Sequence, residues 1–370
     1  MSSYRIIISG GGTGGHIFPA IAIATTLIAR YPGTEIIFTG ADNRMEMERV
    51  PAAGFKIIGL PVSGLNRKNP FRNIKVILNL LKSISMAKKI LREFKPDAVI
   101  GVGGYASGPT LWAATSLHIP TLIQEQNSYA GITNKLLGKR VDKICVAYEG
   151  MERFFPASKI VLTGNPVRKD LESGIHLKTD ALEYFKLSPN RLTVLILGGS
   201  LGARTINTGI IRGLAQLIEA DIQLIWQTGR IYHETIKGQL EGKDTRNQLW
   251  LSDFISRMDY AYAAADLVVS RAGAGTISEL CLLRKASVLV PSPNVAEDHQ
   301  TKNASAIVNR QAAVMIADKD AENQLSDCIM QMIRQPEQLE SLSSNIGLLA
   351  QHRSAEHIVD EIIKIIKKDK

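Results

Sequence analysis

The sequence is poor in cysteine and contains no long hydrophobic run. Its three cysteines, Cys145, Cys281 and Cys328, are far apart and odd in number. That excludes a CxxC metal site, argues against a disulfide framework and favours a reducing compartment. No apolar run reaches about 18 residues, so no segment is expected to span a bilayer. The first apolar run passes directly into glycines, which indicates a buried strand rather than a signal peptide.

Acidic residues are scarce in the first half of the chain. Residues 1–165 hold 10 acidic and 20 basic side chains, whereas residues 166–370 hold 25 and 24. The net charge of +9 therefore belongs to the first half, which should face an anionic partner. A hydrophobic fraction of 45% and a charged fraction of 21% exclude a disordered or fibrous protein. The length of 370 residues predicts about two domains.

Short β-branched runs alternate with longer amphipathic stretches such as Pro19–Arg30 and Ile74–Phe94. This alternation predicts βαβ units and parallel sheets covered on both faces. The predicted strands are Arg5–Ser9, Glu35–Thr39, Lys56–Leu60, Ala98–Val102, Thr121–Gln124 and Lys143–Ala147, followed by Thr193–Leu197, Gln223–Gln227, Leu249–Ser252, Leu267–Ser270 and Ser287–Val290.

The two halves of the chain resemble each other. Gly10 and Gly40 are 30 residues apart, as are Gly199 and Gly229, and each interval reads as strand, glycine loop, helix and strand. We therefore predict an α/β protein of two Rossmann-like domains, over residues 1–164 and 165–345. Residues 346–370 are expected to form a C-terminal helix that packs back on the first domain.

Glycine loops follow four of the predicted strands. The first, residues 10–15, fits GxGxxG between a strand and a helix, where backbone N–H groups can bind a pyrophosphate. There are two alternatives. The loop could be only a tight turn that packs the helix on the sheet, or it could bind a dinucleotide whose ribose contacts an acidic residue such as Asp42. His16 directly after the last glycine argues against the dinucleotide. The other loops, at 101–109, 198–204 and 271–279, describe a cleft that holds two ligands from opposite sides.

Seven motifs in order give the chain a close resemblance to the MurG family of peptidoglycan glycosyltransferases. They are GGTGGHIFPA, GGYASGP, EQNSYAGITN, GNPVR, GGSLGAR, the loop before ISEL, and DHQTKNA. The resemblance covers about residues 5–360. It implies a GT-B fold and transfer of N-acetylglucosamine from UDP-GlcNAc to the 4-hydroxyl of lipid I, with inversion, giving lipid II. Another GT-B UDP-sugar transferase, a dinucleotide-dependent oxidoreductase and a non-catalytic nucleotide-sugar-binding protein are the alternatives.

The resemblance implies a donor site in the second domain. Because no acidic pair suggests a metal site, the diphosphate is expected to meet Ser200, the loop amides and helix start at Ala274, Gly275 and Thr276, and Arg168. Glu279 is implied for the ribose, the Ile255 backbone for uracil, and Gln300 and Asn303 for the sugar. The chain departs from the family at Gln124, Gly275 and His299, and His299 puts one sugar contact in doubt. No metal or cofactor is expected.

The resemblance also implies an acceptor site in the first domain, with Thr13, Gly14, Gly15, Asn127 and Asn134 as substrate contacts. His16 is the expected general base, because imidazole titrates near neutrality. The alternative is that His16 has only a structural role at the start of the helix. Glu125 is the rival base, or the group that orients the base.

Residues 66–95 carry nine basic side chains and one acidic one, interleaved with apolar residues. This composition predicts contact of residues 65–95 with an anionic membrane surface, and hence a peripheral protein on the cytoplasmic face of the bacterial inner membrane. The alternative is a core helix with a solvated basic face. Because no nucleic-acid-reading motif accompanies the segment, no nucleic acid is expected as a partner.

Overall fold

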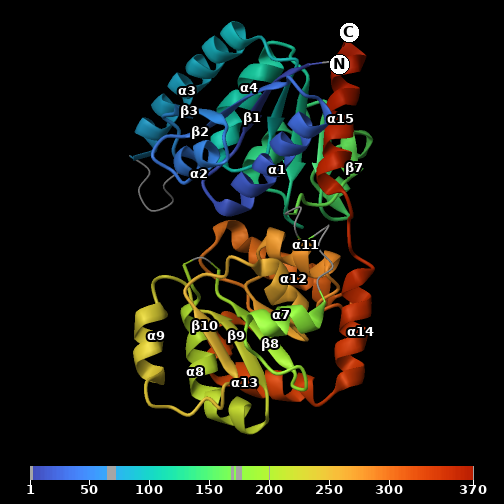
Figure 1. The fold of residues 1–370 in the computed structure, drawn as a ribbon. Helices are drawn as coiled ribbons and strands as arrows, with labels where there is room; N and C mark the ends of the chain where they lie inside the picture. Colours follow the sequence, from blue (N-terminus) through green and yellow to red (C-terminus); the bar gives the residue numbers. More distant parts are fainter. Residues whose placement is uncertain (1–2, 65–71, 168–170, 172–176, 200, 370) are drawn as a thin grey trace. The chain divides into compact units, whose positions relative to one another are not determined.

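The computed structural model describes residues 3–64, 72–167, 171, 177–199 and 201–369. The chain forms two compact units (Figure 1). The first unit contains residues 1–167 and 351–370, and the second contains residues 168–350. These boundaries lie a few residues beyond the predicted positions 164 and 345.

The first unit is built on a parallel sheet of seven strands in the order β3-β2-β1-β4-β5-β6-β7. Its strands are β1 (Arg5–Ser9), β2 (Glu35–Ala41), β3 (Lys56–Leu60), β4 (Ala98–Gly101), β5 (Thr121–Glu125), β6 (Lys143–Val146) and β7 (Ile160–Leu162). Its helices are α1 (Gly14–Arg30), α2 (Glu46–Ala52), α3 (Arg72–Phe94), α4 (Gly108–Ser116), α5 (Ile132–Leu137) and α15 (Ser354–Asp369), with short 3-10 turns η1 (Tyr105–Ser107), η2 (Met151–Arg153) and η3 (Ala157–Lys159).

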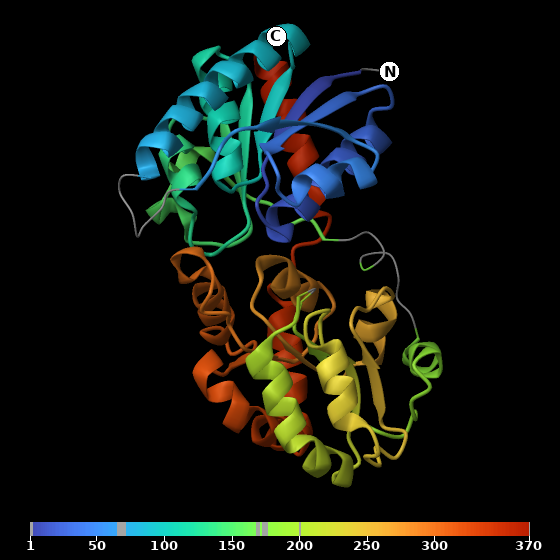
Figure 2. The same ribbon diagram turned by 90° about the vertical axis from the view of Figure 1, so that its left-hand side faces the viewer.

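Successive residues of β1 face opposite sides of this sheet, as the pleat of a strand requires. Ile6 and Ile8 pack into a core with α1 and α15, while Ile7 packs into a second core with α3 and α4. Figure 2 shows α15 behind the sheet, on the face opposite α3. The apolar run of β1 is therefore buried on both faces, as expected for a parallel strand.

The last helix, α15, belongs to the first unit although it follows the second in sequence. It packs along α1 (Figure 1), and its isoleucines, Ile358 and Ile362 among them, complete the core beneath that helix. Arg30 at the end of α1 pairs with Asp360 at 2.8 Å.

The second unit contains a parallel sheet of six strands in the order β10-β9-β8-β11-β12-β13. Its strands are β8 (Thr193–Leu197), β9 (Gln223–Gln227), β10 (Leu249–Ser252), β11 (Leu267–Ser270), β12 (Ser287–Leu289) and β13 (Val314–Met315). Its helices are α7 (Lys178–Tyr184), α8 (Arg204–Glu219), α9 (His233–Leu240), α10 (Met258–Ala264), α11 (Ala274–Leu282), α12 (His299–Val308), α13 (Asp318–Ile333) and α14 (Pro336–Gly347), with the turn η4 (Ala296–Asp298).

Two parallel sheets confirm the predicted fold class, and the repeated pattern corresponds to β1–α1–β2 and β8–α8–β9. The two edge strands β7 and β13 were not predicted, because three and two residues are too few to show a pattern. Helix α1 begins at Gly14, five residues before the predicted Pro19. Glycine has a low helix propensity, so Gly14 and Gly15 gave no sign of the helix start.

Candidate active site

In the first unit, the loops that follow β1, β4 and β5 meet at the carboxyl edge of the sheet, because these three strands are neighbours. Thr13 is the N-cap of α1, and Gly14 and Gly15 form its first turn. This edge is where open α/β sheets bind their ligands.

His16 lies half-buried in the first turn of α1, with its Nδ1 3.1 Å from the Thr13 hydroxyl. The loop after β4 lies against its ring. A Cβ atom on Gly103 would lie 2.9 Å from His16 Cδ2, and one on Gly104 would lie 3.5 Å from Nδ1. Both glycines have positive φ, 91° and 77°. Only glycine combines this backbone conformation with so close an approach, so the GGY motif holds the imidazole in place.

Glu125, the last residue of β5, is buried at the same edge. Its Oε1 accepts hydrogen bonds from the Asn127 backbone N–H at 3.0 Å and side-chain amide at 3.3 Å. Its Oε2 accepts from the Gly131 N–H at 3.0 Å and the Asn134 amide at 2.9 Å. The carboxylate thus organises the whole turn 125–134, and it brings the predicted residues Asn127 and Asn134 together.

Burial raises the pKa of Glu125 above its ordinary value, and the hydrogen bonds from Asn127, Asn134 and Gly131 oppose that rise. A carboxylate offers about four lone-pair positions, and four donors already occupy them. To accept a proton from a substrate, Glu125 would have to break one of these bonds. His16, at the same edge, is only half-buried.

Gln126 and Gln124, which the sequence did not single out as site residues, form a buried amide network with Asn165. Gln124 donates to Asn165 Oδ1 at 2.8 Å, and the Asn165 amide donates to the Gln126 carbonyl at 3.0 Å. Gln126 donates to the Val102 carbonyl at 2.6 Å and to Gln124 Oε1. The family departure at Gln124 is therefore accommodated by hydrogen bonds at both ends of its side-chain amide. The polar run Gln124–Asn127 was the available signal.

Two buried acceptors in this part of the first unit have no hydrogen-bond partner among the described residues. They are Gln126 Oε1 and Asn134 Oδ1. Buried polar atoms are normally paired, so each calls for a donor from water or from a ligand.

In the second unit, Gln227 at the end of β9 joins two of the expected donor loops. Its amide donates to the Gly199 carbonyl at 3.1 Å, and its Oε1 accepts from the Ile255 N–H at 3.0 Å. The sequence did not indicate this role, because the contact joins three strand ends that are far apart in the chain. The expected contacts Ser200 and Arg168 lie outside the described residues.

Helix α11 begins directly after the fourth glycine loop, with Gly273 as its N-cap and Ala274, Gly275 and Thr276 in its first turn. A Cβ atom on Gly275 would meet nothing within 4 Å, so a larger family residue fits there without rearrangement. Glu279, one turn later, accepts a hydrogen bond from the Tyr262 hydroxyl at 2.8 Å.

Arg271 and Asp318 anchor the loop before α11, and the sequence analysis did not predict this role. Asp318 Oδ1 accepts from Arg271 and from the Thr205 hydroxyl, each at 2.5 Å. One carboxylate oxygen thereby ties the start of the α11 loop to the start of α8. Asp318 lies 47 residues beyond Arg271, so no local spacing could reveal the pair.

The remaining predicted donor residues lie on α12. Gln300 is half-buried, and its Oε1 accepts from the Ser292 N–H at 2.8 Å, which leaves its NH₂ group as the part that can donate to a sugar. Asn303 is fully buried, and is therefore the weaker candidate for a sugar contact. His299 is the first residue of the helix.

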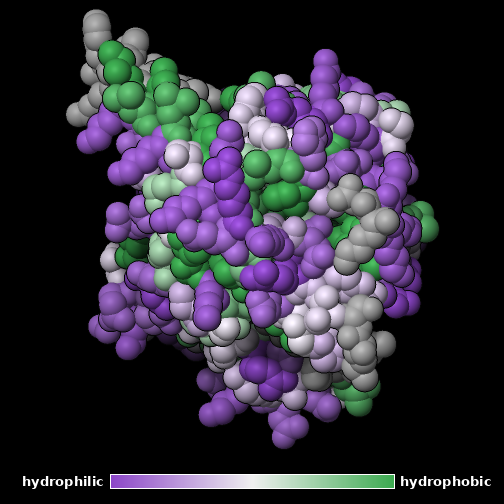
Figure 3. All heavy atoms as spheres, turned by 90° about the horizontal axis from the view of Figure 1, so that it is seen from above, coloured by the Kyte–Doolittle hydropathy of each residue, from purple (hydrophilic) through white to green (hydrophobic). Residues whose placement is uncertain are grey.

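Helix α3 exposes apolar side chains in its first half. Ile74, Ile77, Leu78 and Leu81, the α3 patch, are 62%, 53%, 61% and 59% exposed. Their i, i+3, i+4, i+7 spacing places them on one face of the helix. Figure 3 shows a group of hydrophobic residues at the upper left of the view, next to the atoms drawn in grey. Residues 65–71 of the predicted membrane-contact segment lie outside the described residues.

The alternative of a core helix with a solvated basic face applies to the second half of α3 only. There Ala87, Leu91 and Phe94 are buried in the core with α4. In the first half the exposed face is apolar and carries Lys75 and Lys82 beside it, both exposed.

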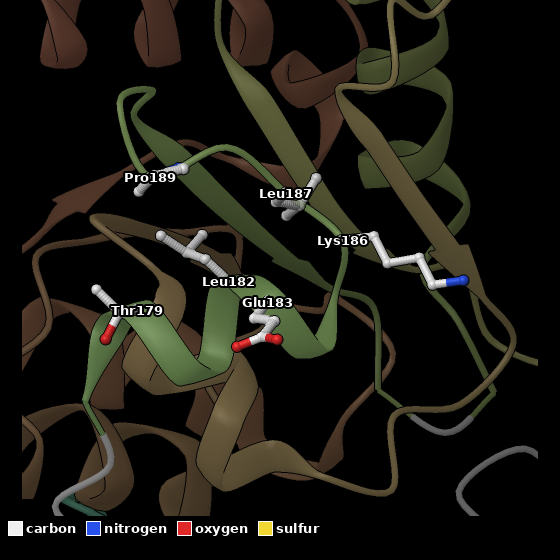
Figure 4. Close-up of a pocket in the computed structure, with 6 residues that line it drawn as sticks. All are labelled: Thr179, Leu182, Glu183, Lys186, Leu187 and Pro189. Atoms are coloured by element: carbon white, nitrogen blue, oxygen red, sulfur yellow. The ribbon is translucent and has the colours of Figure 1, made fainter.

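A pocket of about 460 Å³ lies beside α7 (Figure 4). Its lining residues lie between Thr179 and Pro189, before β8, whereas the glycine loop follows β8. The pocket is therefore at the other end of that strand from the candidate site. Burial raises the pKa of Cys145 and Cys281 to about 12, so neither thiol is a ready nucleophile.

Two searches of the described ranges complete the survey of the site. No cluster of three or more His, Cys, Asp or Glu residues in these ranges could hold a metal ion. None of the described helices is long and apolar enough to cross a membrane.

The comparisons with known proteins agree with this architecture. Residues 6–146 match the glycosyltransferase family 28 N-terminal domain, and residues 193–361 match its C-terminal domain. A relative from Parabacteroides distasonis is 63% identical over 369 residues and all of both chains. One from Flavobacterium psychrophilum is 50% identical over 370 residues and all of both chains. Both are named UDP-N-acetylglucosamine–N-acetylmuramyl-(pentapeptide) pyrophosphoryl-undecaprenol N-acetylglucosamine transferase.

Among solved structures, that of Acinetobacter baumannii MurG matches with a TM-score of 0.81 and 29% identity, covering 98% of this chain and 100% of that one. A UDP-N-acetylglucosamine 2-epimerase matches with a TM-score of 0.64 at 13% identity, covering 98% of this chain and 96% of that one. The second likeness shows a shared fold alone.

Proposed function

This chain belongs to glycosyltransferase family 28, and we propose that it transfers N-acetylglucosamine from UDP-GlcNAc to undecaprenyl-pyrophosphoryl-MurNAc-pentapeptide (lipid I), giving lipid II. The observation that carries this proposal is the 63% identity, over the whole of both chains, to a relative that bears the name of that transferase. The expected acceptor-side and donor-side residues that the structure describes follow strands at the carboxyl edges of their own sheets, which is consistent with the assignment.

The reaction forms a bond between the 4-hydroxyl oxygen of the acceptor MurNAc and the anomeric carbon of GlcNAc. The bond between that carbon and the diphosphate oxygen breaks, UDP leaves, and the hydroxyl proton passes to a base. We assign the base to His16, whose ring is held by Thr13 and by the close approach of Gly103 and Gly104. Glu125 acts as a positioning residue, because its lone pairs already accept four hydrogen bonds.

The donor is held by the second unit. The start of α11, at Ala274–Thr276, offers backbone N–H groups and the positive end of a helix dipole to the leaving diphosphate. Glu279 accepts from the ribose hydroxyls while Tyr262 fixes its carboxylate. Because the Ile255 N–H is bonded to Gln227, the contact of this backbone with uracil falls to the Ile255 carbonyl. Gln300 donates to a GlcNAc hydroxyl through its NH₂ group.

The protein docks on the cytoplasmic face of the membrane that carries its lipid acceptor. The α3 patch supports this proposal, because four large apolar side chains, each more than half exposed, occupy one helix face beside basic residues. Such a face gains free energy in the interfacial layer of anionic lipid. Each lysine or arginine near that surface adds about 1 kcal/mol.

One assay tests the function. Purified protein with UDP-GlcNAc and a water-soluble lipid I analogue should release UDP only when both are present. It should form a disaccharide product whose new linkage is inverted. UDP release without the analogue, or binding of UDP-GlcNAc with no product, would contradict the assignment. NAD(P)H oxidation would instead favour an oxidoreductase.

A further inference from the structure

Glu46 is a buried carboxylate on α2 that braces the first glycine loop. Its side chain is 0% exposed. Its Oε2 accepts from the Gly12 N–H at 2.9 Å, and its Oε1 accepts from the Ala41 N–H at 3.0 Å. No lysine or arginine of the described ranges pairs with it. Removing a carboxylate from water is costly, so its charge is stabilised here by backbone donors.

The glycines around Glu46 explain how a carboxylate fits against the backbone. A Cβ atom on Gly40 would lie 2.7 Å from Glu46 Cγ, and one on Gly11 would overlap the carboxylate. Two glycines that read in the sequence as phosphate-loop and turn residues are therefore the positions that make room for Glu46. Its side chain joins the loop after β1 to the end of β2.

The Gly12 N–H is the kind of group that a dinucleotide fold offers to a pyrophosphate. In this protein the Gly12 N–H donates its hydrogen bond to the Glu46 carboxylate. A second anion at this amide would face the negative charge of Glu46 and would find its hydrogen bond already taken. This one amide is thus unavailable to a pyrophosphate, and its function lies in what it holds.

What it holds is His16. Gly12 is followed by Thr13, whose hydroxyl lies 3.1 Å from His16 Nδ1. The carbonyl of Gly11 also lies so near Gly104 that a Cβ atom there would meet it. A shift of Gly12 therefore moves the Thr13 hydroxyl and one wall of the imidazole site together.

We propose that Glu46 is a positioning residue for the transfer reaction, acting on His16 through Gly12 and Thr13. This inference rests on the function proposed above. An error of about 1 Å in the position of a reacting group can lower turnover by about 100-fold. Loss of the Gly12 hydrogen bond therefore lowers kcat and leaves donor binding to the second unit unchanged.

The test compares Glu46→Gln and Glu46→Asp with the matched control Glu48→Gln, an exposed residue on the same helix. In Glu46→Gln one oxygen becomes an NH₂ group that faces an N–H, and in Glu46→Asp the carboxylate is too short to reach both donors. Each variant should lower kcat by about 10- to 100-fold, with the KM for UDP-GlcNAc within twofold of wild type. Glu48→Gln should match wild type.

A double-mutant cycle with Thr13→Val separates positioning from general stability. If Glu46 acts through Thr13, the double variant Glu46→Gln/Thr13→Val loses no more turnover than the more damaged single variant. Multiplicative losses would overturn the route through Thr13. Wild-type kcat in a folded Glu46→Gln or Glu46→Asp protein would overturn the inference, as would a raised KM for UDP-GlcNAc. If Glu46→Gln does not fold, Glu46→Asp decides the question. An inactive wild-type protein would instead refute the proposed function.

Discussion

Replacing Glu125 by glutamine tests whether this carboxylate is the base or the support of the acceptor loop. All four of its donors are N–H groups, two on each oxygen. Glutamine keeps one oxygen and turns an NH₂ group toward the other pair. Whichever way the amide is oriented, two hydrogen bonds are lost and two donors face a donor.

The expected loss of stability follows from these contacts. A hydrogen bond to a charged group contributes about 1.5–3 kcal/mol, so two of them amount to about 3–6 kcal/mol. Because the buried charge is also removed, part of this loss is recovered, and we expect a net destabilisation of about 2–4 kcal/mol. For a unit of this size the melting temperature should fall by about 5–15 °C.

The assay pairs thermal unfolding with the pH dependence of kcat/KM for Glu125→Gln and His16→Ala. Glu125→Gln should melt lower and turn over more slowly, yet keep the acidic limb of the pH profile that His16 produces. His16→Ala should lose about 10²–10⁴-fold in kcat, lose that limb, and melt near the wild-type temperature. Glu152→Gln, an exposed residue of the same unit, serves as the control.

Two results would refute this reasoning. One is a Glu125→Gln protein with wild-type stability whose residual activity no longer shows the acidic limb. The other is a His16→Ala protein that keeps both the limb and most of its turnover. Either would return the role of base to Glu125.

Three further predictions concern other parts of the molecule. Burial lowers the pKa of Lys285 to about 8, so the folded state releases its proton before the unfolded state does. The free energy of unfolding should therefore rise by about 2 kcal/mol between pH 8 and pH 10, and Lys285→Met should abolish this rise. Leu78→Ser/Leu81→Ser should weaken binding to anionic vesicles, measured by co-sedimentation, without changing kcat on a soluble acceptor. Tyr262→Phe, which removes a hydrogen bond to Glu279, should raise the KM for UDP-GlcNAc by about 2- to 10-fold in steady-state assays.

Each of these predictions has a matched control of the same chemistry. Lys237→Met removes an exposed lysine of the second unit and should leave the pH dependence of stability as in wild type. Leu348→Ser changes a leucine that is 83% exposed outside the α3 patch and should leave vesicle binding intact. Tyr184→Phe should leave donor kinetics unchanged. An equal effect in variant and control would show that the local contact is not the cause.

The strands of the interior could be predicted because burial on both faces produces continuous β-branched runs. Arg5–Ser9, Thr193–Leu197 and Leu267–Ser270 have the predicted bounds. The short edge strands could not, since an edge pair of two or three residues needs no distinctive composition. The first turn of α1 was not predicted, because Gly14 and Gly15 belong to a glycine-rich loop motif and have a low helix propensity.

The motifs located the loops of the candidate site, but the residues that fix these loops came from distant parts of the chain. Gln227 reaches the loops after β8 and β10, and Asp318 reaches Arg271 from the start of α13. Such contacts depend on which strands are neighbours, and a single sequence does not report strand order. The sequence identified Glu125 but not whether it is the base or a positioning residue, because its four hydrogen-bond donors are seen only in the structure.

The two repeats hold their glycine loops in opposite ways. In the first, the Glu46 carboxylate accepts from the Gly12 N–H and so places a negative charge inside the loop. In the second, the neutral amide of Gln227 donates to the Gly199 carbonyl and brings no charge. The Glu46 charge disfavours a phosphate at the Gly12 amide itself, whereas no such charge lies against the Gly199 carbonyl. This difference is consistent with the proposed placement of the nucleotide in the second unit and of His16 in the first.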